Sequence, residues 1–305
     1  MQSMRVGDVS RTRSNRRFTI LALAPAWLFL AALIGYPLVS VLTDAFSHAH
    51  LVNGDVGGFA GLENFEKVVS DPHFGPAVRN TLVWTVGSVV GEFVIGLGAA
   101  VLLNVRVRGQ GFFRVATFIP WLVPIVVAGM TWEWILNPDF GIFNSLLTQS
   151  GLVESPINFL GDKNWAMATV VFVNIWRTFP YYTISFLAAM QAIPNELYEA
   201  ASLDGAGAWR RFWSVTMPQL RSVSLIIVFI HLIWTAVNFD FIWVMTQGGP
   251  NYATITLPIL IYRYSLQQYD VGAASALSTL MLIATSLVFV VYYRYRRRLS
   301  EETVG

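Results

Sequence analysis

Eight polar and aromatic side chains recur at helical spacing inside two long apolar stretches of the chain. The two sets are Asn174, Arg177, Thr178 and Tyr181, followed by His231, Trp234, Thr235 and Asn238. Within each set the positions are i, i+3, i+4 and i+7, so each set lies on one face of a helix. Each face offers an amide, a hydroxyl and an aromatic ring. Sugar hydroxyls need paired donors and acceptors, and sugar C–H faces pack on aromatic rings, so the two faces predict a sugar site.

Arg177 is the most informative of these residues because it lies inside an apolar stretch. A charge at the centre of a membrane helix costs on the order of 3 kcal/mol, so the guanidinium should face protein or water. It could contact a substrate, or it could form a structural ion pair. The intramembrane carboxylates available for such a pair are Glu92, Glu133 and Asp240. His231 has a similar alternative, as an interior histidine whose hydrogen bonds are met by protein.

The elements that carry these faces are predicted to be transmembrane helices. The chain has 305 residues, of which 55% are hydrophobic and 12% are charged, whereas a soluble domain carries about 25% charged residues. Apolar runs of roughly 20 residues recur, which predicts an all-α integral membrane protein whose first run is a retained span. The six predicted spans are Phe18–Thr43, Thr81–Leu103, Val115–Leu136, Ala166–Met190, Val223–Thr246 and Val271–Tyr293.

Two features inside the spans predict packing rather than chemistry. Gly87 and Gly91 form a G-x-x-x-G pair, which favours close helix contact. Three tryptophans near the outer ends of spans are interpreted as interfacial aromatics. They are Trp132, Trp134 and Trp243.

The basic residues predict the orientation of the spans, because cytoplasmic segments carry the excess of Lys and Arg. One side holds Arg5, Arg11, Arg13, Arg16, Arg17, Arg106, Arg108, Arg114, Arg210, Arg211, Arg221, Arg294, Arg296, Arg297 and Arg298. The other side holds Lys67, Arg79, Lys163 and Arg263. The prediction is a transmembrane domain over 18–293, with cytoplasmic tails at 1–17 and 294–305.

The cytoplasmic loop between the fourth and fifth spans, residues 195–218, is predicted to be ordered. Asn195 can open a short helix, with Glu196 in its first turn where a negative charge suits the helix dipole. Gly205 and Gly207 allow a sharp turn, and a second short helix is expected before Pro218, which marks the start of the fifth span.

The second helix of this loop carries an aromatic face of Trp209, Phe212 and Trp213. One interpretation is that the loop lies on lipid with the tryptophans as anchors. The other is that it docks on a soluble partner. In the second case Trp209 and Trp213 are expected to tie the loop to the protein's own spans, while Glu199 and the turn at Gly205 contact the partner.

The loop resembles the EAA motif of permease subunits of ATP-binding-cassette importers. The matching positions are Glu199, Ala200, Ala201, Gly205 and Pro218. Val215 and Met217 stand where Ile and Leu are more usual. The resemblance implies that the loop forms coupling helices in a groove of a separate ATPase subunit. The expected coupling residues are Glu199, Ala200, Ala201, Asp204 and Gly205.

Four further stretches resemble the carbohydrate, maltose-type branch of these binding-protein-dependent permeases. They are APAWLFLAALIGYP from Ala24, GLENFEKVVSDPHFGPAVRNTLVWT from Gly61, IPWLVPIVVAGMTWEWILNPDFGIFN from Ile119, and MTQGGPNYATITLP from Met245. The resemblance covers nearly the whole chain. It implies a second, different permease (a heterodimer), two copies of an ATPase subunit (a homodimer) and an extracytoplasmic sugar-binding protein. It also implies a multi-pass location in a bacterial inner membrane.

The same resemblance supports the two polar faces. In the maltose-type permease the sugar is held from a segment of the form N-x-W-x-x-x-P-Y, which matches Asn174, Trp176, Pro180 and Tyr181 here. Counting back from Gly248-Gly249-Pro250 places Trp234, Thr235 and Asn238 at the corresponding positions of the fifth span. Arg177 and Thr235 depart from the maltose pattern, which leaves anionic or phosphorylated sugars open.

The remaining motifs predict no catalysis in this chain. It has no cysteine and no G-x-x-x-x-G-K-[ST] sequence, so ATP hydrolysis is expected in a separate subunit. The histidines form no metal-ligand pattern beyond a weak His48/His50 pair, and no cofactor, metal or nucleic acid is expected. The prediction is the permease half of an ATP-driven sugar importer working by alternating access. Alternatives are an importer of an anionic polyol such as glycerol phosphate, a stand-alone secondary transporter or channel, and a membrane enzyme acting on lipid-linked sugar.

Overall fold

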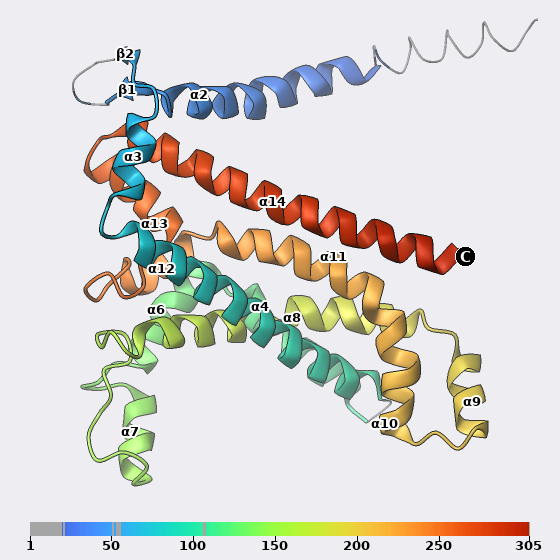
Figure 1. Cartoon of the computed structure of the whole chain (residues 1–305). Coiled ribbons are helices and arrows are strands. Elements are labelled where there is room, and N and C mark those ends of the chain that lie inside the picture. The colour runs from blue at the N-terminus through green and yellow to red at the C-terminus, as the bar shows by residue number, and fades with distance from the viewer. Residues whose placement is uncertain (1–19, 21, 51, 53–55, 106–107, 305) are drawn as a thin grey trace, which may run out of the picture. The chain divides into compact units, whose positions relative to one another are not determined.

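The structure, a computed structural model, describes residue 20 and residues 22–50, 52, 56–105 and 108–304 (Figure 1). The predicted N-terminal tail and Phe18 lie outside the described residues. The chain divides into two compact units. The larger unit comprises Val69–Arg263 and residues from Met281 onward, and the smaller comprises residues up to Val68 together with Tyr264–Leu280.

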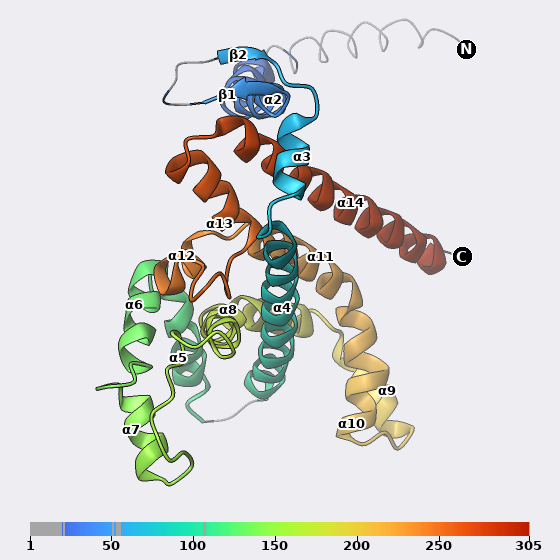
Figure 2. The same ribbon diagram turned by 60° about the vertical axis from the view of Figure 1, so that its left-hand side comes forward.

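The larger unit consists of helices packed around α4 and α8. Figures 1 and 2 agree in placing α7 and the α9–α10 pair at opposite ends of this unit. Its elements are α4 (Phe74–Asn104), α5 (Gln110–Leu122), α6 (Ile125–Ile135), α7 (Ile142–Gln149), α8 (Ala166–Gln191), α9 (Asn195–Leu203), α10 (Ala208–Arg211), the π-helix η2 (Phe212–Thr216), α11 (Met217–Ala236), α12 (Asp240–Thr246) and α13 (Leu257–Tyr262).

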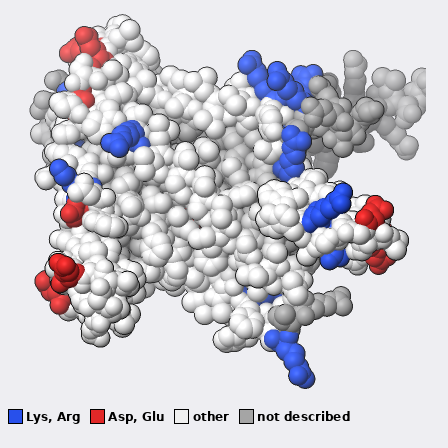
Figure 3. All heavy atoms as spheres, turned by 60° about the horizontal axis from the view of Figure 1, so that its bottom comes forward, with Lys and Arg blue, Asp and Glu red and all other residues white. Residues whose placement is uncertain are grey.

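Four helical segments of the described chain are long and apolar enough to cross a membrane, namely Ala22–Asp44, Phe74–Asn104, Ala208–Ala236 and Val271–Arg298. The bent pair α5–α6 passes the same test as one broken span. The 26 residues of α8 are also long enough, but Asn174 and Arg177 interrupt its apolar sequence. These six segments match the six predicted spans. The face in Figure 3 fits this, because its wide middle is almost free of charged side chains.

The third predicted span, Val115–Leu136, is wrong as a single straight helix. Helices α5 and α6 meet at an angle of 95°. The residue between them, Val123, has an extended backbone (φ −70°, ψ 127°), and Pro124 follows it. Because the proline ring disfavours helical geometry in the residue before it, the bend falls where the sequence places this proline.

The fifth predicted span, Val223–Thr246, is also two helices. Helix α11 ends at Ala236 and α12 begins at Asp240. The Oδ1 atom of Asn238 accepts a hydrogen bond from the backbone N–H of Phe241 at 3.2 Å, which satisfies one free donor at the start of α12. The apolar composition that predicted one span therefore hides a break that a polar side chain stabilises.

Close contact between α4 and α8 depends on glycines in α4. A Cβ atom added at Gly91 would overlap the side chain of Ile175, and one at Gly96 would overlap Tyr182. The added atom at Gly96 would also lie 2.9 Å from the backbone oxygen of Phe179. The predicted packing role of the Gly87/Gly91 pair is confirmed, since a Cβ added at Gly87 would also lie 3.3 Å from the side chain of Val171.

The 195–218 loop contains one short helix rather than two. Helix α9 has the predicted start, with Glu196 in its first turn. The second predicted helix is instead the beginning of one helical segment that extends from Ala208 to Ala236. Pro218 lies within this segment, just after η2. Proline has no N–H to donate, and the wider π turn before it lets the helix continue.

The smaller unit contains the first membrane segment and a small cap. Its elements are the π-helix η1 (Ala31–Gly35), α2 (Tyr36–Asp44), an antiparallel pair of strands β1 (Ser47–Ala49) and β2 (Val56–Phe59), α3 (Glu63–Val69), the π-helix η3 (Arg263–Gln267) and the start of α14 (Val271–Val304). Helices α3, η3 and α14 each extend past the boundary of this unit. Helix α14 continues eleven residues past the predicted end of the sixth span, Tyr293.

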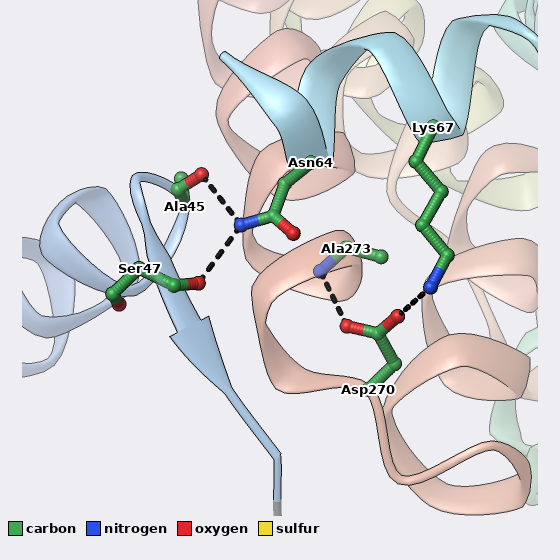
Figure 4. A network of polar contacts seen from close by, with 6 residues as sticks. All are labelled: Ala45, Ser47, Asn64, Lys67, Asp270 and Ala273. Carbon is green, nitrogen blue, oxygen red and sulfur yellow. Dashed lines mark hydrogen bonds and ion pairs between the residues drawn. The ribbon is translucent and has the colours of Figure 1, made fainter. Parts of the chain in front are cut away.

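Polar contacts hold the cap together (Figure 4). Asn64 Nδ2 donates to the backbone oxygens of Ala45 (3.1 Å) and Ser47 (2.9 Å). Asp270 Oδ2 lies 2.6 Å from Lys67 Nζ, and its Oδ1 accepts from the backbone N–H of Ala273 at 2.9 Å. Asp270 therefore caps α14 and fixes α3 beside it.

Asp270→Ala is expected to lower the free energy of unfolding by about 1–2 kcal/mol, because it removes both the helix cap and the ion pair. Lys67→Ala is the matched control. It removes only the ion pair, whose lysine side chain is 55% exposed, so its expected effect is below about 1 kcal/mol. Thermal unfolding of the detergent-solubilised protein measures both, and equal midpoints for the two variants would contradict the capping role.

Candidate substrate cavity and coupling loop

A cavity of about 340 Å³ lies in the larger unit, lined from α4, α5, α6, α8, α11 and the residues just after α11. This volume falls within the range of roughly 300–1,000 Å³ that small-molecule sites occupy. All eight side chains on the two predicted helix faces line it. Four further lining residues were not singled out in the sequence, namely Trp84, Trp121, Ile125 and Val237.

The eight predicted side chains differ in accessibility. The buried ones are Asn174, Thr178, His231 and Thr235. The ones that keep accessible surface are Arg177, Tyr181, Trp234 and Asn238. Helical spacing could not separate the two groups, because it gives the face of a helix but not the neighbours that cover each position. A bound molecule would reach the second group first.

Glu92 is the centre of a buried polar network beside the cavity. Its side chain is fully buried in the middle of α4. Asn174 Nδ2 donates to Glu92 Oε1 at 2.9 Å, and His231 Nδ1 lies 2.8 Å from Glu92 Oε2. One carboxylate therefore connects α4, α8 and α11. Because a buried carboxylate needs such partners, the amide of Asn174 and the Nδ1 atom of His231 are already engaged by protein.

The sequence contained a signal for this network. A carboxylate inside an apolar span is costly and marks a functional or structural site. From the sequence, Glu92 is only one of three possible partners for Arg177, because side-chain spacing does not show that Asn174 and His231 reach the same carboxylate. His231 thus has the protein contact that the interior-histidine interpretation expects, and it also lines the cavity.

Arg177 is half-buried near the middle of α8. Among the described residues, no carboxylate lies within 4.0 Å of its guanidinium, and its Nε atom has no hydrogen-bond partner. The predicted alternative of an ion pair with Glu92, Glu133 or Asp240 is therefore not formed in this structure. The guanidinium instead lines the cavity.

Aromatic rings form much of the remaining wall. The ring of Tyr181 stacks on His231 with centroids 5.3 Å apart and lies 6.4 Å from Trp234. Trp84 is buried, and its Nε1 donates to the backbone oxygen of Thr235 at 2.8 Å. The ring of Trp234 is 61% exposed. Tyr181 and Trp234 are thus available to pack against an apolar face of a bound molecule.

The three tryptophans expected at the outer interface have different surroundings. Trp132 packs edge-on against Phe172 and Trp176. Trp243 stacks on Phe239 and contacts Tyr262. Trp134 contacts Phe140 and is 71% exposed. Exposure suits an interfacial ring for Trp134, whereas the other two pack between helices.

The predicted coupling residues lie on α9 and the turn after it. Glu199, Ala200, Asp204 and Gly205 are exposed, and Ala201 is partly covered. Gly205 has a φ of +76°, which side chains with a Cβ adopt at a cost, so glycine suits this turn. The acidic side chains of Glu199 and Asp204 are exposed to solvent. The geometry leaves these residues free for contact with another molecule.

Helix α9 is fastened to the helix that leads into α11. The hydroxyl groups of Tyr198 and Thr216 lie 3.0 Å apart, and Arg211 Nη1 donates to Ser202 Oγ at 2.9 Å. Trp209 was expected to tie the loop to the spans, but it does not contact them in this way. It packs on Phe212 and Trp213, and the two indoles are 74% and 51% exposed. Hydroxyl and guanidinium contacts, rather than tryptophans, hold the loop to the protein.

Comparison with known proteins identifies the family. Residues 92–301 match the family described as binding-protein-dependent transport system inner membrane component. This chain belongs to that family. It is therefore a permease component of an inner membrane transport system.

Curated relatives of this permease cover nearly the same length. It is 34% identical to the sulfoquinovosyl glycerol transport system permease protein SmoG of Agrobacterium fabrum, over 93% of this chain and 91% of that one. It is 37% identical to the trehalose/maltose transport system permease protein MalF of Thermococcus litoralis, over 78% of this chain and 81% of that one.

Solved structures show the same fold. The permease superposes on a chain of a bacterial ABC transporter involved in the import of the acidic polysaccharide alginate with a TM-score of 0.82. The match covers 94% of this chain and 98% of that one at 22% identity. A chain of the MetNI methionine ABC transporter matches less completely, with a TM-score of 0.54 over 75% of this chain and 98% of that one at 20% identity.

Proposed function

We propose that this chain is one permease subunit of an ATP-driven, binding-protein-dependent importer of a sugar of two or more units. The observation that carries the proposal is the cavity in the larger unit, with Arg177, Asn238, Tyr181 and Trp234 accessible at membrane depth. Polar groups beside aromatic rings suit sugar hydroxyls and C–H faces. The names of the two curated relatives, which refer to a sulfoquinovosyl glycerol and a trehalose/maltose system, support the same substrate class.

The importer requires partners. A second permease completes the substrate path, because a single chain leaves Trp234 61% exposed at the edge of the cavity. Two ATPase subunits supply the energy, and a binding protein delivers sugar from outside. The structural neighbours are chains of ABC transporters, one of them in complex with an alginate pentasaccharide-bound periplasmic protein, which supports these kinds of partner.

The orientation follows from the basic residues. We place both termini and the 195–218 loop in the cytoplasm, with a transmembrane domain over 18–293 and tails at 1–17 and 294–305. Glu199 and the turn at Gly205 then face the compartment where ATP is hydrolysed. The exposed surface of α9 is the part that would enter a groove of the ATPase subunit.

The continuous helix from Ala208 to Ala236 gives the proposal a mechanical path. It begins beside the coupling loop and carries His231, Trp234 and Thr235 near its other end. At 1.5 Å per residue, about 39 Å of helix joins Ala208 to Trp234, and this helix bends between α10 and α11 (Figure 1). Because α9 is fastened to the first turns of this helix, ATPase closure would move the loop and the cavity wall together, as alternating access requires.

Glu199→Lys tests the coupling role. The variant is expected to insert in the membrane normally, but substrate-stimulated ATP hydrolysis and uptake by the reconstituted importer should fall at least about tenfold, because the substitution reverses the charge that the exposed Glu199 would present to the ATPase. Gln191→Lys, which adds a lysine at the exposed end of α8, is the control and should retain both activities. Unchanged coupling in Glu199→Lys would contradict the docking role.

One alternative substrate class is favoured by a specific observation. An importer of an anionic polyol such as glycerol phosphate would use the guanidinium of Arg177, which forms no ion pair with the described residues. A stand-alone secondary transporter is a weaker candidate, because it gives no role to the exposed EAA loop. Co-purification with an ATPase subunit, and uptake that stops without ATP, would separate the importer from the secondary transporter.

A further inference from the structure

We propose that the substrate of this permease carries an acidic group, which the guanidinium of Arg177 binds inside the cavity. The inference rests on the proposed function and narrows its substrate class from sugars in general to acidic sugars. It depends on three observations: the depth of Arg177 in the membrane, the engagement of the nearest carboxylate by other residues, and the composition of the cavity wall.

The position of Arg177 within the membrane makes its positive charge energetically unfavourable. Helix α8 begins at Ala166 and ends at Gln191, so Arg177 lies close to its middle and hence close to the middle of the membrane. A charge at this depth costs on the order of 3 kcal/mol even on scales that allow side chains to relax. Such a residue needs either a counter-charge or a ligand, and the guanidinium stays protonated.

Glu92, a possible counter-charge for Arg177 in the sequence, contacts other residues in the structure. Both oxygens of Glu92 are engaged, one by the amide of Asn174 and the other by Nδ1 of His231. Among the residues that the structure describes, no ion pair involves Arg177, and no Asp or Glu lines the cavity. Glu92 acts on the guanidinium only as a nearby negative charge and makes no ion pair with it within 4.0 Å, so the N–H donors of Arg177 can still bind an acidic ligand.

The donor geometry of arginine then selects the ligand. A guanidinium presents five N–H donors in a planar fork that matches a carboxylate, phosphate or sulfonate with two parallel hydrogen bonds. A neutral hydroxyl can accept from one of these donors but leaves the charge uncompensated, and an uncompensated charge in a low-dielectric site is unfavourable. An acidic group meets both requirements.

The neighbouring wall indicates that the acidic group belongs to a sugar rather than to a free inorganic ion. Tyr181 lies one helical turn after Arg177, and its ring is 6.4 Å from that of Trp234. Two accessible rings beside a guanidinium provide an apolar surface for a sugar ring next to the anion site. The amide nitrogen of Asn238 remains a donor, because its Oδ1 is used within the chain.

The test compares two probes that differ only in the acidic group, methyl β-D-glucuronide and methyl β-D-glucoside. Their binding to the purified complete importer is measured by quenching of tryptophan fluorescence and by calorimetry, with and without ATP under conditions that block hydrolysis. Glycerol 3-phosphate and inorganic phosphate are added as separate probes. The wild-type importer is expected to bind the glucuronide at least about tenfold more tightly than the glucoside.

Variants assign the preference to Arg177. Arg177→Gln should reduce the preference for the glucuronide to about twofold or less, and Arg177→Lys should retain a clear preference because it keeps the charge. Arg79→Gln is the matched control, since Arg79 is exposed on α4 and does not line the cavity. It should preserve the wild-type preference. Tighter binding of inorganic phosphate than of the glucuronide would show a simple anion site and overturn the sugar assignment.

Equal affinities for the two glycosides in the wild-type importer would overturn the inference, as would an unchanged preference in Arg177→Gln. Failure of the inference differs from failure of the proposed function. An importer that co-purifies with its ATPase and takes up a neutral sugar only with ATP would refute the acidic substrate and leave the importer function intact. A chain that never associates with an ATPase would refute both.

Discussion

Replacing Glu92 with alanine is expected to lower the free energy of unfolding of the larger unit by about 3–5 kcal/mol. This is the cost of removing one partner from a buried polar network. The loss leaves the amide of Asn174 and Nδ1 of His231 buried without the acceptor that each contacts at present. It also opens a hole at the point where α4, α8 and α11 meet. The measurement is the temperature at which half of the detergent-purified protein loses its monodisperse elution.

Glu92→Gln is the matched control for this prediction. Glutamine has the same shape, can accept from Asn174, and can donate to His231 if the imidazole proton moves to Nε2. It removes only the charge, so its expected loss of stability is less than half that of Glu92→Ala. If the alanine and glutamine variants lose equal stability, the negative charge of Glu92, rather than the hydrogen bond from Asn174 and the close contact with His231, holds the network together. If Glu92→Ala unfolds at the wild-type temperature, the network makes no contribution to stability.

Gly96→Val is expected to prevent α4 and α8 from packing in their present positions, with a destabilisation of about 3 kcal/mol or more. A Cβ at Gly96 would overlap the side chain of Tyr182 and approach the backbone of Phe179 and Thr183. Backbone atoms of a packed helix have no alternative rotamer, so the two helices would have to separate. Expression level and thermal stability of the purified protein measure the effect.

Gly98→Val provides the control, because Gly98 lies on the same helix only two residues later and a Cβ there meets nothing within 4 Å. Both substitutions add the same side chain and the same intrinsic helix preference. A difference between them therefore reports the contact with α8. Equal behaviour of the two variants would contradict a tight α4–α8 contact at Gly96.

The glycines of α4 show how much of the helix packing the sequence predicts. The G-x-x-x-G pair at Gly87 and Gly91 identified the helix that packs closely, and Gly91 does lie against Ile175. Gly96 has an equally tight contact but stands outside the motif. Which glycines meet a neighbour depends on the angle at which two helices cross, and that angle is set by both surfaces together.

The breaks between α5 and α6 and between α11 and α12 show a second limit of prediction from the sequence. Pro124 restricts Val123 and so favours a bend on local grounds, whereas the apolar composition of Val115–Leu136 predicts only that this segment crosses the membrane. The break after Ala236 has no proline. It depends on Asn238 accepting a hydrogen bond from Phe241, a local contact that composition does not reveal.

The amino-acid sequence by itself determined the class of this protein, its membrane segments, the position of the EAA loop and the two polar helix faces. These properties depend on local composition and on the periodicity of a helix, which a single chain displays directly. All eight residues on those faces do line one cavity.

The tertiary structure decided what each of those residues can do. It joined Glu92, from a span more than eighty residues earlier, to Asn174 and His231, and so left Arg177 without an ion pair among the described residues. It also showed the 195–218 loop continuing into the helix that carries Trp234. Contacts between distant segments depend on how helices pack. The spacing of side chains along one helix does not show which residues of other helices lie against it.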